Sequence, residues 1–107
     1  VYEDKQVNGK LTLGENLADL GGLQTSLSLC KDDKTKKDCL FSWAKIWRAN
    51  SRREYAQQMI VLDPHSPPHL RINGILQHLT DFYRLFDVKQ DDKLFLEPEK
   101  RCMLWSE

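Results

Sequence analysis

The sequence predicts an all-α fold. Apolar residues recur at the i, i+3, i+4, i+7 spacing of half-buried helices in three stretches, at positions 17–27, 40–47 and 72–86. No stretch alternates apolar and polar residues as a strand does, and no segment repeats. The chain has 107 residues, which is the size of one domain or less.

Composition narrows the class of function. Sixteen basic and sixteen acidic residues cancel, so no global field favours nucleic acid or an anionic membrane as a partner. No apolar run approaches the roughly 20 residues needed to cross a bilayer. The three cysteines allow at most one internal disulfide, and whether Cys30 pairs with Cys39 is left open.

The first predicted helix follows a polar segment at residues 1–10. Thr12 and Glu15 fit the two ends of a capping box, which places the N-terminus of the helix at Thr12 and its end near Cys30. The charged residues 31–38 predict an exposed, mobile linker. A half-buried helix over residues 40–47 follows, with Trp43 and Trp47 on its inner face.

Prolines separate the remaining predicted helices. Ser51 and Glu54 fit a second capping box, opening a helix whose inner face would be Tyr55, Met59 and Leu62. Prolines at 64, 67 and 68 end that helix. One last helix is expected to begin near Pro68, where proline is well tolerated, and to continue to residue 86, before a loop-rich tail anchored by Leu94, Phe95, Leu96, Met103, Leu104 and Trp105.

The most informative stretch covers residues 8–23. It places Glu15 and Asp19 four residues apart on a helix, followed by Gly21 and Gly22. Like charges at this spacing repel by roughly 0.2–0.5 kcal/mol, and each interior glycine costs about 1 kcal/mol. A helix with both penalties is expected to hold a cation and to let another backbone approach closely. The alternative is that Glu15 only caps the helix and that Asp19 is solvated.

This stretch resembles the Gly-Glu-Asn-x-Ala-Asp-x-Gly-Gly segment of the neprilysin and endothelin-converting-enzyme family of zinc endopeptidases. The resemblance implies that Glu15 is the third protein ligand to a zinc ion. It also implies that Asp19 supports a zinc-bound histidine by a hydrogen bond. In the family the two histidine ligands come from an upstream H-E-x-x-H helix, a motif that this sequence lacks. Residues 1–107 are therefore expected to be the C-terminal segment of such a catalytic domain.

Residues 65–71 resemble the His-Ser-Pro-x-x-x-Arg segment of the same family. The resemblance implies that His65 donates to the tetrahedral oxyanion and that Arg71 contacts a backbone carbonyl of the substrate. The alternatives are a loop histidine satisfied by a backbone carbonyl and an arginine in a surface salt bridge. A metal pair formed by His65 and His69 on one helix is disfavoured, because Pro67 and Pro68 lie between them.

Residues 102–105, Cys-Met-Leu-Trp, match the end of the animal ectoenzymes of the family. The resemblance implies a disulfide between Cys102 and a cysteine upstream of Val1. It also favours an extracellular or membrane-anchored location for the full-length protein, with a cytoplasmic location as the alternative.

The expected function is zinc-dependent hydrolysis of short peptides by the full-length protein. Its partners are then the peptide substrate and the upstream remainder of the polypeptide, and no nucleic acid. The isolated chain is expected to be inactive, because one carboxylate and one histidine do not hold a catalytic zinc ion tightly. Two other classes stay open: a non-catalytic helical module that docks through its apolar faces, and a metal-independent regulator descended from a peptidase.

Overall fold

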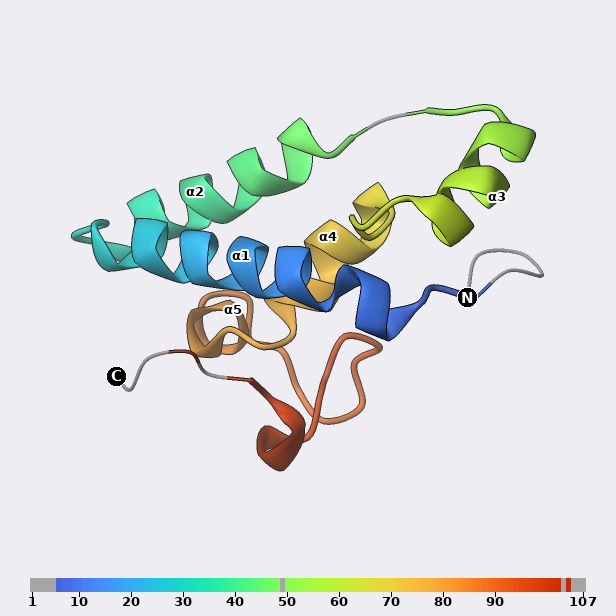
Figure 1. Cartoon of the computed structure of the whole chain (residues 1–107). Helices are drawn as coiled ribbons and strands as arrows, with labels where there is room; N and C mark the ends of the chain where they lie inside the picture. The colour runs from blue at the N-terminus through green and yellow to red at the C-terminus, as the bar shows by residue number, and fades with distance from the viewer. Residues whose placement is uncertain (1–5, 49, 103, 105–107) are drawn as a thin grey trace.

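The computed structural model describes residues 6–48, 50–102 and 104 of the chain. Within these residues the secondary structure is entirely helical, which confirms the predicted all-α class (Figure 1). In chain order the elements are α1 (Gly9–Ser28), α2 (Asp33–Ile46), α3 (Arg53–Leu62), α4 (Pro68–Leu76), α5 (Thr80–Leu85) and a short 3₁₀ turn, η1 (Pro98–Lys100).

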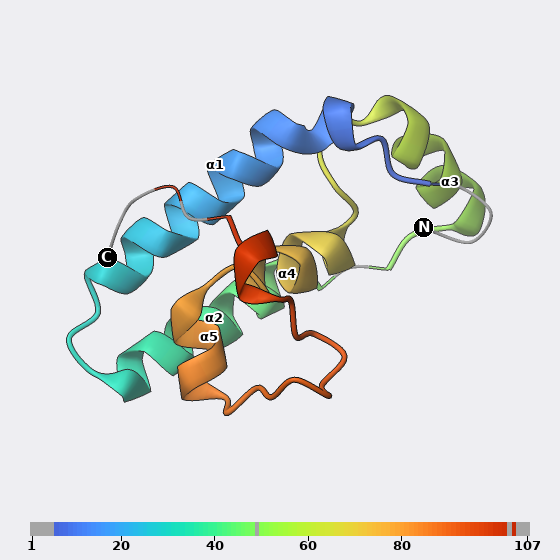
Figure 2. The ribbon, with the colours of Figure 1, turned by 90° about the horizontal axis from the view of Figure 1, so that it is seen from below.

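The longest helix, α1, lies at the centre and contacts both α2 and α4. α2 runs back along α1 after a short turn, and α3 lies beyond the N-terminal end of α1 (Figures 1 and 2). One apolar cluster joins four of the helices, and its buried members are Leu20, Leu23, Leu27, Leu40, Ile75, Leu76, Leu79, Phe82 and Leu85. Because the core uses only the second half of α1, the first half presents polar residues toward the start of α4.

The N-terminus of α1 differs from the prediction. Asn8 caps the helix, and its Oδ1 accepts from the backbone N–H groups of Lys10 and Leu11 at 3.1 and 3.2 Å. The capping box of Thr12 and Glu15 was therefore wrong: Thr12 lies inside the helix and is buried. Asn is as good an N-cap as Thr, and the earlier cap lengthens the helix by a turn. Glu15 consequently has no capping role.

The predicted linker at residues 31–38 was also wrong, because α2 begins at Asp33. Asp32 caps it by accepting from the backbone N–H of Thr35 at 2.7 Å, a bond that holds the pKa of the Asp32 carboxyl below its ordinary value. Lys34 and Asp38 form an exposed i,i+4 pair at 3.0 Å. Opposite charges at this spacing support a helix. Here they lie in the first turns of α2, so the helix includes residues that the sequence predicted as a linker.

α3 was located correctly, but its cap and its inner face were not. No side-chain hydrogen bond caps it, so the capping box at Ser51 is absent. Ile60 is its buried residue, whereas Tyr55 and Leu62 are 58% and 61% exposed. The predicted face does not pack, because α3 makes few contacts with the other helices of the described chain (Figure 1).

The predicted final helix is divided in two. Pro68 occupies the first turn of α4, as expected, but α4 ends at Leu76 and α5 starts at Thr80. The Tyr83 hydroxyl donates to the Gln77 carbonyl at 2.7 Å and so satisfies the backbone at the break. Phe82 is buried in the core, and Tyr83 and Phe86 pack against it.

The tail is loop-rich, as predicted, and folds back onto α5. The Arg101 guanidinium lies 3.6 Å from the centre of the Tyr83 ring, and Leu94 packs against the core. The anchors predicted at Met103 and Trp105 lie outside the described residues. No helix in the described part of the chain is long and apolar enough to cross a bilayer.

The structure also bears on the cysteines and on the predicted close approach at the glycine pair. Cys30, Cys39 and Cys102 are free thiols. Burial, together with the neighbouring Cys30, raises the pKa of the Cys39 thiol. A Cβ at Gly22 would meet no atom within 4 Å, so no described segment makes the close approach predicted at this position.

Candidate functional site

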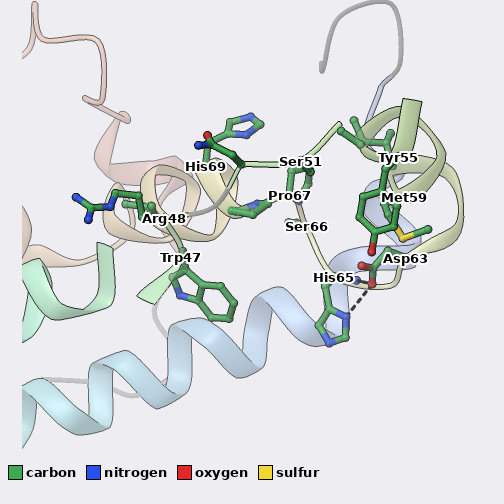
Figure 3. Close-up of a pocket in the computed structure, with 15 residues that line it drawn as sticks. Trp47, Arg48, Ser51, Tyr55, Met59, Asp63, His65, Ser66, Pro67 and His69 are labelled. Atoms are coloured by element: carbon green, nitrogen blue, oxygen red, sulfur yellow. Dashed lines mark hydrogen bonds and ion pairs between the residues drawn. The ribbon is translucent and has the colours of Figure 1, made fainter. Parts of the chain in front are cut away.

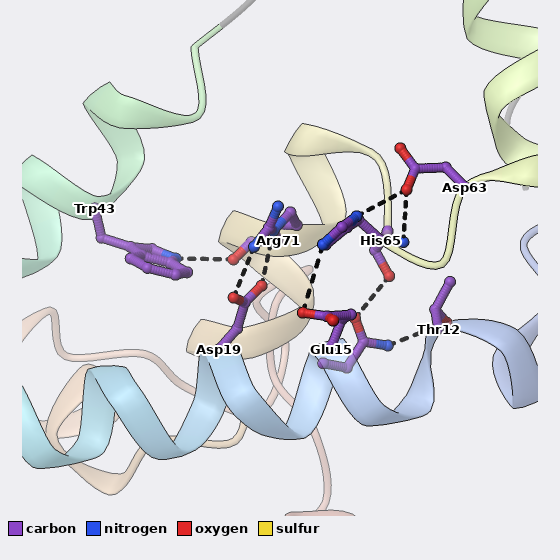
Figure 4. A network of polar contacts seen from close by, with 9 residues as sticks. Thr12, Glu15, Asp19, Trp43, Asp63, His65 and Arg71 are labelled. Atoms are coloured by element: carbon purple, nitrogen blue, oxygen red, sulfur yellow. Dashed lines mark hydrogen bonds and ion pairs between the residues drawn. The ribbon is translucent and has the colours of Figure 1, made fainter.

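The four residues singled out from the sequence lie together. Glu15 and Asp19 stand one turn apart on the same face of α1, and their side chains point toward His65 and Arg71 (Figure 4). His65 lies in the loop that joins α3 to α4, and Arg71 lies on α4. Two motifs far apart in the sequence thus form one polar site, at the end of α1 that the apolar core leaves uncovered.

Glu15 and His65 face each other across the open side of the site. Glu15 Oε2 lies 3.5 Å from His65 Nε2, and the two side chains are 46% and 42% exposed. This contact is longer than a good hydrogen bond. Both groups therefore keep room for a third group, a metal ion or a substrate atom, between or beside them.

Asp63 holds the other side of the His65 ring. Its Oδ1 lies 2.8 Å from His65 Nδ1 and also accepts the backbone N–H of His65 at 2.9 Å. The backbone hydrogen bond is the main reason that the pKa of the Asp63 carboxyl lies below its ordinary value. An ionised carboxylate at Nδ1 keeps a hydrogen on that nitrogen and turns Nε2 toward Glu15. His65 is therefore not the loop histidine bonded to a carbonyl that the alternative described.

Asp63 was not singled out from the sequence. The signal available there was weak: an aspartate two residues before a histidine, followed by prolines, which is typical of an Asx turn. Such turns are common in loops without function, so the pattern gave no reason to place Asp63 beside the imidazole.

Asp19 and Arg71 form a bidentate ion pair. Arg71 donates from Nε and from one terminal nitrogen to the two Asp19 oxygens, each at 2.8 Å. The side chains of Arg71 and Asp19 are 15% and 9% exposed, so this is not a surface salt bridge. The Arg71 guanidinium also stacks 3.6 Å from the Trp47 ring centre, and Trp43 Nε1 donates to the Arg71 carbonyl at 2.8 Å. Arg71 is thus fixed between a carboxylate and an indole.

We expect Arg71→Ala to lower the free energy of unfolding of the chain by about 3 kcal/mol, because it leaves the Asp19 carboxylate buried without its partner. The double variant Asp19→Asn/Arg71→Ala should lose less than the two single variants together. Urea unfolding followed by circular dichroism measures both. Arg84→Ala is the matched control: Arg84 also bridges two carboxylates, Asp33 and Asp81, but is 47% exposed, so its loss should be much smaller. Equal losses of unfolding free energy in Arg71→Ala and Arg84→Ala would contradict the assignment of Asp19 and Arg71 as a buried pair.

A cavity opens next to the site. It has a volume of about 660 Å³ and lies between α3, the end of α2 and the loop before α4 (Figure 3). Its walls include Trp47, Tyr55, Met59, His65 and Pro67. Polar side chains, among them Arg48, Asp63 and His69, share the walls with the apolar ones. A hollow of this size suits one side chain or a small ligand. From the sequence, Trp47 was expected only to pack, whereas it both lines this cavity and covers Arg71.

The described residues do not form a metal site by themselves. No group of three or more histidine, cysteine, aspartate or glutamate side chains gathers there in a way that could hold a metal ion. Structural and catalytic zinc sites need three or four protein ligands. The Glu15 carboxylate is a kind of donor that zinc binds, and by itself it fits a zinc ion as a single ligand.

Known proteins match most of this chain. The sequence profile of peptidase family M13 matches residues 2–102. The neutral endopeptidase of Lactococcus lactis subsp. lactis (strain IL1403) is 42% identical over 100 residues, covering 92% of this chain and 16% of the relative. Human neprilysin is 33% identical over 116 residues, covering 94% of this chain and 15% of neprilysin. The chain therefore spans about a sixth of the length of these curated relatives.

A solved structure shows the same fold. In the crystal structure of the Mycobacterium tuberculosis zinc metalloprotease Zmp1 with an inhibitor, the matching part has a TM-score of 0.80 and 40% sequence identity. The match covers 94% of this chain and 17% of that protein. The profile, the two relatives and the shared fold lead to one conclusion, which confirms the resemblance seen in the sequence: the chain belongs to peptidase family M13.

Proposed function

We propose that the full-length protein is a zinc-dependent endopeptidase that hydrolyses peptide bonds in short peptides. In this proposal the chain supplies one zinc ligand and the group that stabilises the oxyanion. The supporting observation is that Glu15 on α1 and His65 before α4 meet at 3.5 Å, on the open side of the site.

Glu15 would bind the zinc ion together with two histidines from the upstream part of the polypeptide. Three features support this role: its carboxylate is half-exposed, it takes no part in capping α1, and it points into the site (Figure 4). When bound, a zinc ion there would supply Lewis acidity for the scissile carbonyl and for a nucleophilic water. A carboxylate ligand completes a two-histidine site and leaves a position open for that water.

His65 would donate a hydrogen bond to the oxyanion that develops when water attacks. Asp63 holds the Nδ1 hydrogen, so the ring is oriented with Nε2 toward the site. When both ring nitrogens carry a hydrogen, Nε2 donates to an oxygen placed beside Glu15. A donor fixed in advance stabilises the developing charge without reorganisation.

Arg71 would contact a backbone carbonyl of the peptide, and Asp19 would orient a zinc-bound histidine. A guanidinium has five N–H donors, and Asp19 occupies two of them. Each carboxylate oxygen of Asp19 has a second lone pair, which suits the far ring nitrogen of a histidine ligand. The ion pair would therefore hold a substrate contact and a ligand contact in one rigid unit.

The expected location and disulfide also remain proposals. Cys102 is exposed and is a free thiol in this chain, so it is open to pair with a cysteine upstream of Val1 in an extracellular or membrane-anchored protein. Peptide mapping of the full-length protein without reduction would show this bond, and a free Cys102 there would favour the cytoplasmic alternative.

Zinc content tests the proposed function directly. Mass spectrometry should find about one zinc ion per full-length chain and none on the isolated 107-residue chain. Peptide hydrolysis should be confined to the full-length protein and should stop when a chelator is added. If neither form binds zinc, the non-catalytic docking module becomes the better explanation, and the exposed apolar residues Tyr55, Val61 and Leu62 of α3 its candidate surface.

A further inference from the structure

Two uncharged polar residues are buried in the described part of the chain, and both belong to one chain of hydrogen bonds. They are Thr12, 2% exposed, and Ser66, 7% exposed. Thr12 lies on α1, one turn before the site, and Ser66 follows His65 directly. Burial of a polar group is costly unless a partner satisfies it, so the partners of these two residues show what holds them there.

Asn16 connects them. Its side-chain nitrogen donates to Thr12 Oγ1 at 3.3 Å, and its side-chain oxygen accepts from the Ser66 hydroxyl at 2.7 Å. Thr12 Oγ1 in turn donates to the Asn8 carbonyl at 3.1 Å. Each donor thus meets an acceptor, which fixes the orientation of the Asn16 amide. The Asn16–Ser66 bond joins α1 to the loop that carries His65.

The residues next to Asn16 and Ser66 in the sequence indicate what this bond does. Asn16 is adjacent to Glu15, and Ser66 is adjacent to His65, so the bond ties the two backbone segments whose side chains face each other at 3.5 Å. The Glu15–His65 contact itself is long and half-exposed and cannot fix that spacing. The Asn16–Ser66 bond is shorter and partly buried, with Ser66 only 7% exposed, and it can fix the spacing.

We propose that Asn16 and Ser66 are a positioning pair that sets the distance between the Glu15 carboxylate and the His65 imidazole. The inference rests on the proposed function, because it concerns the spacing of a zinc ligand and an oxyanion donor. Neither residue touches substrate in this proposal. A displacement of about 1 Å in such a site can cost up to roughly 10²-fold in rate.

The test is a set of variants of the full-length enzyme. Ser66→Ala should lower kcat about 10-fold or more and leave KM and zinc content nearly unchanged. Asn16→Ala should do the same, and the double variant should be no worse than either single variant, because both remove the same bond. Ser66→Thr keeps the hydroxyl and should recover most of the lost turnover.

Ser26→Ala is the matched control. Ser26 lies on α1, where its hydroxyl donates to the Gly22 carbonyl one turn earlier, and it is exposed and remote from the site. Removing this hydroxyl should therefore leave kcat unchanged. The inference fails if Ser66→Ala keeps the wild-type kcat. It also fails if Ser66→Thr is as slow as Ser66→Ala and the unfolding temperatures of the two variants are lowered equally. Absence of zinc-dependent turnover in the wild-type enzyme would instead remove the proposed function, and the inference with it.

Discussion

Replacing Glu15 by glutamine in the full-length enzyme is expected to remove the bound zinc and, with it, peptide hydrolysis. The substitution keeps the size and hydrogen-bonding shape of the side chain but removes the negative charge that a zinc ion requires from a carboxylate ligand. Changes at groups that only support a ligand typically cost about 10–100-fold in metal affinity. Loss of the ligand itself should exceed that range. Zinc content by mass spectrometry and turnover of a short peptide measure the two effects together.

The same change at another helical glutamate provides the comparison. Glu54 lies in the first turn of α3 and is exposed, so Glu54→Gln should keep both zinc and activity. The fold of Glu15→Gln should also be intact, because Glu15 caps nothing and is 46% exposed. If Glu15→Gln bound zinc as tightly as wild type, Glu15 would be only a surface residue of α1.

The helices were predictable where the signal is local. The three apolar stretches, the proline at the start of α4 and the break after α3 all follow from the spacing of residue types. The structure has helices at each stretch, although it divides the third into α4 and α5. The ends of helices were less predictable, because several residues near each end can act as caps. Asn8 and Thr12 are both good caps, and only the folded chain, in which Thr12 is buried, decides between them.

The contacts of the site were less predictable than its members. Glu15, Asp19, His65 and Arg71 carry recognisable motifs, and they do lie together. Their partners within the chain depend on how α4 packs on α1, which no local pattern encodes. The Asp19–Arg71 pair, Asp63 beside His65 and the Asn16–Ser66 bond each join side chains brought together by that packing or by a loop turn. The sequence therefore predicted which side chains lie together, and the structure shows the contacts that hold them there.

The end of the last predicted helix illustrates the same limit. Residues 72–86 have one continuous apolar periodicity, which favours a single helix. The structure interrupts it at residues 77–79, where the Tyr83 hydroxyl donates to the Gln77 carbonyl and the Cys102 backbone N–H donates to His78 Nδ1. The break lets Leu79 and Phe82 both reach the core. Tertiary contacts thus override a periodic pattern that is correct on each side of the break.

Replacing His65 by alanine should lower kcat of the full-length enzyme about 10²–10³-fold, the typical cost of losing one oxyanion donor. KM should change little, because the hydrogen bond forms with charge that develops only in the transition state. Asp63→Asn should act in the same direction but less severely, by about 10–100-fold, since it loosens the ring without removing it. Steady-state kinetics with one peptide compares the three enzymes. A rise in KM at constant kcat for His65→Ala would show instead that His65 binds the peptide in its ground state, and would transfer the oxyanion role to another group of the full-length enzyme.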